Sequence, residues 1–190
     1  MTPITLERAA YAPESVAGVY AAAADDVVVE MSRSGRLLVP MRPTIQAIEG
    51  WLFVEQTVED TWVRIDFDAM SFTTGWARAD RALRGQTGLD VANYGLIRFE
   101  SAGWVRLRED RFSVTGDVYL RDISVPITMD VRLVKGDRDS MRFVARATVS
   151  GRELCQSLDA APAVGWMRPI DRIAVLAGIR FTRTDAEDRS

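Results

Sequence analysis

The residue types that carry out most side-chain catalysis are scarce in this sequence. It contains no histidine, so a Ser-His-Asp triad, a Cys-His pair or a histidine-ligated zinc site cannot be built. Lys135 is the only lysine, and its neighbours VKGDRD do not form a phosphate-binding GxxxxGK[ST] loop. Cys155 is the only cysteine, which excludes an intramolecular disulfide and a multi-cysteine metal site. We expect neither a cofactor nor a metal.

The remaining acids and bases form no evident catalytic set. Asp66 and Asp68 lie on the polar face of one predicted strand, so we expect both to be solvated. Asp80 and Arg84 are four residues apart in a predicted helical turn, a spacing that favours a local ion pair. Alternatively, Arg84 lies at the mouth of a binding site and meets a ligand head group. An enzyme would need Asp, Glu, Tyr or Arg side chains that converge on one point.

Charge and hydropathy narrow the range of partners. The net charge is −3 and the arginines are interleaved with acids along the chain, so we expect no nucleic-acid binding. No apolar run approaches the roughly 20 residues that span a bilayer. The opening residues MTPITLERAAYAPES include an acid and lack the apolar stretch of a signal peptide. We therefore expect a cytoplasmic protein without a transmembrane segment.

Alternation of apolar and polar residues dominates the chain from residue 26 onward. In residues 63–69, for example, Val63, Ile65 and Phe67 share one face of a strand and Arg64 faces the other way. The pattern recurs in residues 97–100, 105–108, 112–121, 127–133, 141–149 and 173–183, with less regular strands expected at 27–31, 36–39 and 45–55. An open sheet of so many strands would expose its apolar face and two edges, so the sheet should close into a barrel or fold into a sandwich, and we favour a closed antiparallel barrel.

This pattern also defines the organisation of the chain. We expect residues 1–25 to form a loose or partly helical lead-in, residues 26–183 the barrel domain and residues 184–190 a polar tail. Residues 75–94 and 151–169 interrupt the strands, and residues 79–83 have the composition of a short helix. In residues 105–108 the alternation places Val105 and Leu107 on the apolar face.

Two long segments of the chain carry motifs of one known family. The string SFTTGWARADRALRGQTGLDVANYGLIRFES at residues 71–101 resembles, without a gap, the hallmark segment of the YceI-like family of polyisoprenoid-binding proteins. The matching residues are Ser71, Thr74, Gly75, Asp80, Leu83, Arg84, Asp90, Val91, Tyr94, Ile97, Phe99 and Ser101. The second segment, VTGDVYLRDISVPITMDV at residues 114–131, is identical to the family pattern at Val114, Thr115, Gly116, Asp117, Arg121, Pro126, Thr128, Asp130 and Val131.

The sequence also departs from this family pattern. Ala82 stands where the family usually has a histidine, and Ala79 stands where it has an arginine. Gly88 and Leu89 replace an aromatic pair, and Gly95 replaces a proline. The resemblance thus supports the barrel framework more strongly than it supports the family's ligand.

The resemblance implies an all-β fold: an eight-stranded antiparallel lipocalin-like barrel with a short helical excursion around residues 76–92. It also implies that the lumen holds an isoprenoid-type lipid or an isoprenoid quinone. Such binding needs only an apolar tunnel, although a barrel of this size can instead be filled by its own side chains. Small or flexible inward residues favour free volume: Ala69, Gly116, Ala145, Ala147 and Ala177, beside Met129 and Met141.

The candidate ligand-binding residues are those on the apolar phase of the strands. They are Ile65, Phe67, Ile97, Phe99, Val118, Leu120, Met129, Val131, Met141, Phe143, Ala145 and Ile179. Arg84 and Trp76 are candidates for the mouth of the barrel.

The function we expect is non-enzymatic binding, transport or sequestration of an apolar isoprenoid-type lipid. The alternatives are a structural or stress-associated barrel without a ligand and, less favoured, an enzyme that acts on a small hydrophobic substrate. The resemblance and the outward-facing Leu176 also suggest a homodimer.

Overall fold

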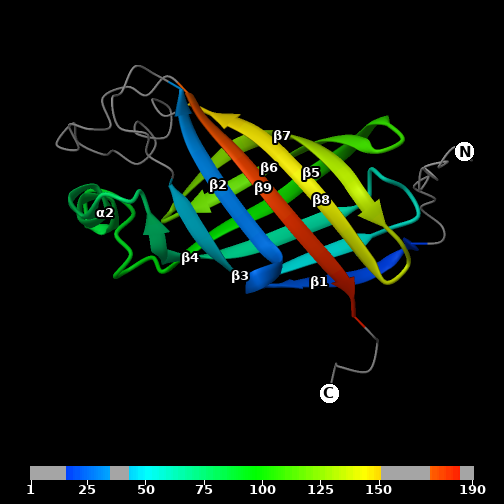
Figure 1. Cartoon of the computed structure of the whole chain (residues 1–190), viewed down its shortest axis with the longest axis horizontal. Helices are drawn as coiled ribbons and strands as arrows, with labels where there is room; N and C mark the ends of the chain where they lie inside the picture. Colours follow the sequence, from blue (N-terminus) through cyan, green and yellow to red (C-terminus); the bar gives the residue numbers. More distant parts are fainter. Residues whose placement is uncertain (1–15, 35–42, 151–171, 185–190) are drawn as a thin grey trace, which may run out of the picture.

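Antiparallel strands form nearly all of the described structure. The computed structural model describes residues 16–34, 43–150 and 172–184 (Figure 1). The elements are β1 (Gly18–Ala23), a short 3-10 turn η1 (Ala24–Asp26), β2 (Val27–Ser34), β3 (Thr44–Val54), β4 (Trp62–Thr73), α2 (Ala77–Arg84), β5 (Leu96–Arg108), β6 (Arg111–Leu120), β7 (Ile123–Gly136), β8 (Ser140–Val149) and β9 (Arg172–Arg183).

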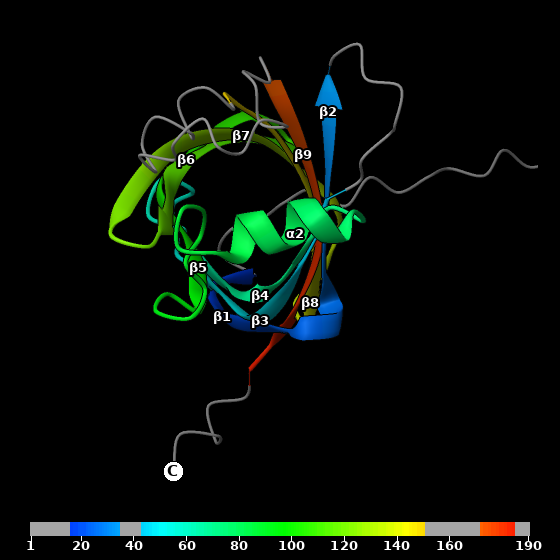
Figure 2. The same ribbon diagram turned by 90° about the vertical axis from the view of Figure 1, so that its left-hand side faces the viewer.

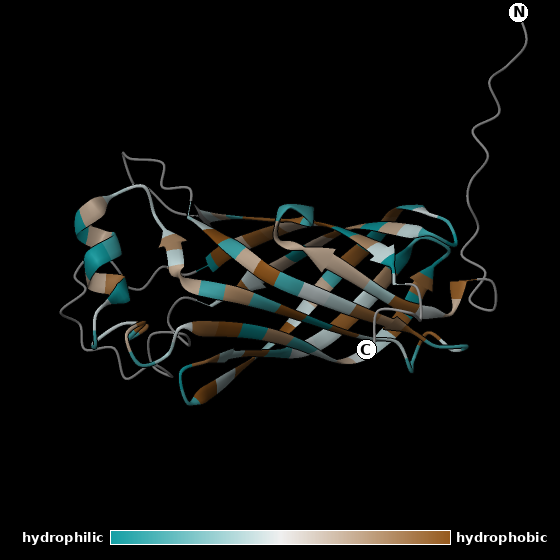
Figure 3. Ribbon diagram, turned by 90° about the horizontal axis from the view of Figure 1, so that it is seen from below, coloured by the Kyte–Doolittle hydropathy of each residue, from teal (hydrophilic) through white to brown (hydrophobic). Residues whose placement is uncertain are grey.

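The sheet closes on itself and forms a barrel. From β3 to β9 each strand pairs with the next along the chain, and β9 pairs with β2, which returns to β3. The strands β1 and β2 occupy one strand position in succession, because both pair with β3 and with β9 on either side of η1. Nine strands therefore fill the eight positions of a closed antiparallel barrel, as expected from the sequence. Along these strands, hydrophobic and hydrophilic residues alternate (Figure 3).

The lead-in expected at residues 1–25 is wrong for residues 18–23, which form β1. Tyr20 and Ala22 point into the core, with 0% and 2% of their surface exposed. Open backbone groups on β3 and β9 give this alanine-rich stretch partners on both sides, which outweighs its helical propensity. The strand expected at residues 36–39 and the second interruption at residues 151–169 lie outside the described residues.

A β-bulge changes the facing of residues in the second half of β5. The register with β6 shifts between Ser101 and Gly103, so the residues beyond this point exchange faces. Val105 and Leu107, expected inside, are 56% and 58% exposed, whereas Trp104 is buried with 6% exposed. The inserted residue thus places an indole ring in the lumen.

The end of the barrel built by β1 is tightly packed. The side chains of Tyr20, Leu52, Phe112 and Met141, each no more than 1% exposed, fill it. The Tyr20 hydroxyl donates to the Val16 carbonyl at 2.7 Å, and the Arg183 guanidinium lies 5.5 Å from the centre of the Tyr20 ring. Side chains thus close the lumen at this end.

Candidate functional site

The opposite end of the barrel holds an internal cavity of about 280 Å³. Its walls come from the ends of β2, β4, β6 and β8 and from the beginnings of β3, β5, β7 and β9, which meet at one end because neighbouring strands are antiparallel. The helix α2 lies across this end (Figure 2). The volume is near the lower end of the range for ligand pockets in proteins.

Every predicted lumen residue except Met141 lines this cavity. The lining residues from the prediction are Ile65, Phe67, Ile97, Phe99, Val118, Leu120, Met129, Val131, Phe143, Ala145 and Ile179. Met141 is only 1% exposed and packs in the closed end instead, so its expected place in the lumen wall is corrected. Of the small residues expected to leave free volume, Ala145 and Ala177 line the cavity, whereas Ala69 is fully buried away from it.

The cavity wall is apolar throughout its depth. Among the described residues that line it, Ser32 and Thr74 have the only polar side chains, and none is ionisable. The Thr74 hydroxyl donates to Asp80 Oδ1 at 2.6 Å, so its proton is already engaged. The wall can therefore exclude water from a hydrocarbon chain but offers no charged group to a ligand.

Aromatic rings that contact one another edge to face form the floor of the cavity. Trp104 meets Phe143 edge to face with ring centres 6.1 Å apart, and Phe143 meets Phe181 in the same way at 6.2 Å. On its other side Trp104 contacts Phe112 at 5.8 Å, within the packed end. The indole nitrogen of Trp104 donates to Ser101 Oγ at 3.3 Å, which leaves the ring's carbon face toward the lumen.

Several lining residues were not predicted. Trp104 was missed because the bulge reverses the alternation of β5, which no residue type in the segment signals. Leu83 and Leu89 flank the end of α2, are 5% and 6% exposed, and line the cavity from outside the strands. Both fall in the helical excursion expected from the sequence, and their apolar character was the available signal.

Polar contacts fix α2 to the rim of the barrel. The Asp80 carboxylate accepts from the Thr73 hydroxyl at 2.9 Å and from the Thr74 backbone amide at 2.7 Å. Burial acts to raise the pKa of Asp80, but the bonds from Thr74 and Thr73 and the nearby Arg84 charge outweigh it and lower the pKa. The carboxylate therefore stays ionised as an anchor for the helix.

Arg84 is held by a backbone carbonyl, and its charge lies near enough to Asp80 to lower the pKa of that carboxyl. Its Nε and Nη2 both donate to the Phe72 carbonyl, at 3.1 and 2.8 Å, so it ties α2 to the end of β4. It is not among the residues that line the cavity. Trp76 immediately precedes α2 and is 50% exposed, also away from the cavity wall.

The loop that follows α2 is fixed to the turn between β6 and β7. Arg121 Nη1 donates to the Gly88 carbonyl at 3.1 Å, and its guanidinium lies 5.6 Å from the centre of the Tyr94 ring. Asp90 and Arg121 have φ values of 47° and 56°, the left-handed region that non-glycine residues seldom adopt. Asp90 and Arg121, which both belong to the matched family segments, thus shape the loop that, together with α2, covers the cavity.

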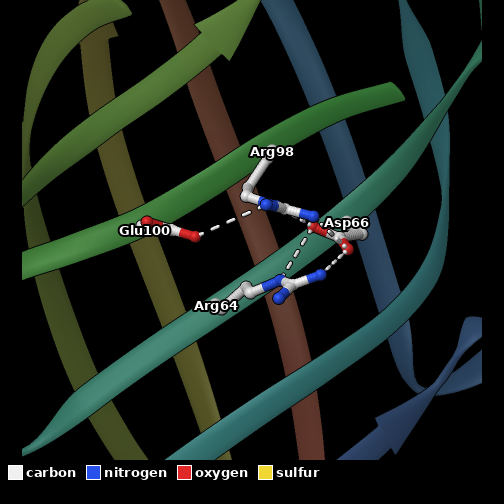
Figure 4. Close-up of polar contacts among 4 residues, drawn as sticks. All are labelled: Arg64, Asp66, Arg98 and Glu100. Atoms are coloured by element: carbon white, nitrogen blue, oxygen red, sulfur yellow. Dashed lines mark hydrogen bonds and ion pairs between the residues drawn. The ribbon is translucent and has the colours of Figure 1, made fainter. Parts of the chain in front are cut away.

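A charge cluster on the outside of the barrel involves Asp66 (Figure 4). We expected Asp66 to be solvated, but it is 5% exposed and held by Arg64 Nη2 at 2.6 Å and Arg98 Nε at 2.8 Å. Burial acts to raise the pKa of Asp66, but the hydrogen bonds and charges of Arg64 and Arg98 outweigh it and lower the pKa. Glu100 adds a weaker contact with Arg98 at 3.8 Å. The cluster joins β4 to β5 and does not face the cavity.

Two negative findings apply to the described residues alone. Within residues 16–34, 43–150 and 172–184, no three acidic, cysteine or histidine side chains gather as metal ligands would. In the same part of the chain, no helix is long and apolar enough to cross a membrane.

The model of the YceI-like domain family matches residues 8–161. The chain belongs to the YceI-like family. Among its relatives are UPF0312 proteins of Vibrio parahaemolyticus, 28% identical over 87 residues, and of Azotobacter vinelandii, 26% identical over 81 residues. These matches cover 46% of this chain and 46% of the Vibrio protein, and 43% of this chain and 42% of the Azotobacter protein. The chain thus aligns with less than half the length of these relatives.

Several solved structures have the same fold. BcnA of Burkholderia cenocepacia superposes with a TM-score of 0.63 at 13% identity, over 84% of this chain and 98% of that one. The YceI protein of Campylobacter jejuni gives 0.62 at 10% identity, over 80% and 90%. A polyisoprenoid-binding domain from Saccharophagus degradans gives 0.62 at 9% identity, over 88% and 99%. At these identities the likeness establishes the barrel fold.

Proposed function

We propose that this protein binds one apolar isoprenoid-type lipid in the barrel cavity and carries or sequesters it without chemical change. The observation that carries the proposal is an apolar cavity that side chains leave open within an otherwise packed barrel. Each methylene group moved from water into such a wall contributes about 0.8 kcal/mol. The YceI-like family and the polyisoprenoid-binding neighbour agree with this choice of ligand.

The chemistry of the wall favours a ligand with a neutral head group, such as an isoprenoid alcohol or quinone. A charged group in this cavity would lose its hydration without gaining a partner, because no ionisable side chain is among the described lining residues. Arg84, the cation expected at the mouth, donates to the Phe72 carbonyl. The described part of the wall also carries no acid or base for catalysis, which supports binding over an enzymatic role.

The test is to fill the cavity from its wall. Ala145 lines the cavity, so Ala145→Trp should remove most of the bound lipid per mole of purified protein. Ala174 precedes the lining residue Val175 on β9 and faces outward, so Ala174→Trp adds the same side chain outside the lumen. This control should keep the parent's lipid load. A folded Ala145→Trp protein with an unchanged load would refute lumen binding.

Two further expectations stand as proposals. The cytoplasmic location rests on composition and is tested by cell fractionation. The homodimer rests on the family resemblance and on Leu176, which is 40% exposed on the outer face of β9. Sedimentation at micromolar concentration should give the mass of two chains, and a Leu176→Glu protein should sediment as a monomer. A parent protein that sediments as a monomer would refute the dimer.

A further inference from the structure

We infer that the cavity limits the length of lipid chain that it can enclose. It holds about three isoprene units, or a linear chain of about twelve carbons, and the excess part of any longer chain stays outside. The inference rests on the proposed lipid-binding function and specifies which lipids the cavity discriminates. It depends on the depth of the open lumen between the strand ends and the aromatic floor.

Three neighbouring strands give the same depth. On β8 the lining residues extend from Val149 at the barrel end to Phe143 at the floor, a span of six residues. On β7 they extend over six residues from Val125 to Val131, and on β6 over six from Val114 to Leu120. On β9 the lining continues to Phe181, whose ring belongs to the floor. Six residues of strand cover about 20 Å, which a strand tilt of about 40° reduces to about 15 Å along the barrel axis.

This depth sets the length of chain that fits. An extended hydrocarbon chain built from carbon–carbon bonds of about 1.5 Å advances about 1.25 Å per bond, so about twelve backbone carbons fill about 15 Å. Three isoprene units contribute that number of backbone carbons. A barrel of eight strands has room for one such chain in cross-section.

The floor is a rigid stop. Beyond Trp104 and Phe143 the lumen is occupied by Phe112, Met141 and Tyr20, each no more than 1% exposed. A chain longer than the open part would have to displace fully buried side chains, and truncating even one such residue typically costs several kcal/mol. The excess chain therefore stays at the open end, near Ser32 and Val149.

The experiment measures affinity for geraniol, farnesol and geranylgeraniol, which have two, three and four isoprene units. Each prenol is supplied from methyl-β-cyclodextrin and followed by calorimetry, with correction for release from the carrier. Since each buried carbon is worth about fourfold in Kd, farnesol should bind at least about a hundredfold tighter than geraniol. Geranylgeraniol should gain less than about threefold over farnesol.

A matched pair of variants tests the floor. Phe143 lines the cavity and Phe112 lies on the other side of Trp104, so Phe143→Leu deepens the lumen and Phe112→Leu is the control. Phe143→Leu should let geranylgeraniol bind at least about tenfold tighter than farnesol. Phe112→Leu should keep the parent's gain of less than about threefold between these two prenols. If the Phe143→Leu chain does not fold, Trp104→Phe replaces it with the same expectation.

The possible failures are distinguishable. A parent affinity that rises tenfold or more from farnesol to geranylgeraniol overturns the length limit and leaves lipid binding in place. If Phe112→Leu increases the affinity gain from farnesol to geranylgeraniol as much as Phe143→Leu does, the assignment of Phe143 to the floor is wrong. Absence of binding by all three prenols overturns the proposed function and this inference together.

Discussion

Trp104 on β5 and Phe143 on β8 meet edge to face across the inside of the barrel, with ring centres 6.1 Å apart. Their strands are not neighbours in the sheet, because β6 and β7 lie between them. The contact therefore crosses the lumen and separates the packed end, with Tyr20 and Phe112, from the open cavity. This contact therefore sets how far a bound ligand can reach into the barrel.

Trp104 should report on ligand that reaches the floor. Its ring lines the cavity and is 6% exposed, so a hydrocarbon chain that touches it will change its emission. Farnesol should alter the tryptophan fluorescence at saturation, and Trp104→Phe should remove the change while calorimetry still detects binding. An equal change in the Trp104→Phe protein would mean that the ligand lies elsewhere.

Gly116 on β6 should tolerate no side chain. A Cβ there would lie 2.3 Å from the Glu100 carbonyl oxygen and 2.7 Å from the Phe99 ring. Gly116→Ala should lower the free energy of unfolding by about 3 kcal/mol, at the upper end of the usual cost of overpacking. Chemical denaturation provides the measurement.

Gly178 on β9 is the matched control, because a Cβ there meets nothing within 4 Å. Gly178→Ala should leave stability unchanged or raise it by about 0.5–1 kcal/mol, since alanine restricts the unfolded chain. Equal losses from both substitutions would contradict the close approach of β5 and β6 at Gly116.

Asp66 should make stability depend on pH in the acid range. Its pKa is lower in the folded chain than its ordinary value of 3.8, so its contribution is present above about pH 4 and is lost as pH falls through the folded pKa. Asp66→Asn should cost about 1.5–3 kcal/mol at neutral pH, the value of hydrogen bonds to charged groups, and less at pH 3. Urea denaturation at both pH values measures this difference.

The control for this prediction is Asp130→Asn. The Asp130 side chain is 57% exposed and lies 4.0 Å from Arg111, so its loss should cost at most about 0.5 kcal/mol. A loss in the Asp66→Asn protein that is the same at pH 3 and pH 7 would contradict the ionic account of the cluster.

Arg84 should stabilise the cover of the cavity rather than contact the ligand. Arg84→Ala removes both bonds to the Phe72 carbonyl, so the amides of α2 should exchange with solvent faster. Affinity for farnesol should change less than about threefold. Arg81→Ala, at an exposed position of the same helix, is the control and should change neither quantity. A tenfold loss of affinity with unchanged exchange would assign Arg84 to the head group instead.

Alternation in the sequence predicted much of the cavity wall where the strands are regular. Where strands are regular, as at Phe67, Val118 and Ala145, the apolar phase points into the lumen as expected. Phe67 and Val118 remain only partly buried although they point inward, because the lumen beside them is open. The helix at residues 77–84 was predicted in its central part, at residues 79–83.

The incorrect predictions concern residues whose position depends on a neighbouring strand. The bulge near Ala102 adds a residue to β5 relative to β6, and nothing in its composition distinguishes it from a regular strand. Ala21 and Ala22 become a strand because β3 and β9 are beside them. Met141, paired with Phe181 across β8 and β9, is 1% exposed in the packed end, because the burial of a side chain depends on its neighbours in three dimensions.

Native mass spectrometry of the purified protein, before and after incubation with farnesol, tests the central claim most directly. Lipid binding in the lumen predicts one bound neutral lipid per chain, or one farnesol once the cavity is supplied, and Ala145→Trp should abolish both. A parent chain that remains free of ligand at saturating farnesol would contradict the claim and favour a structural barrel without a ligand.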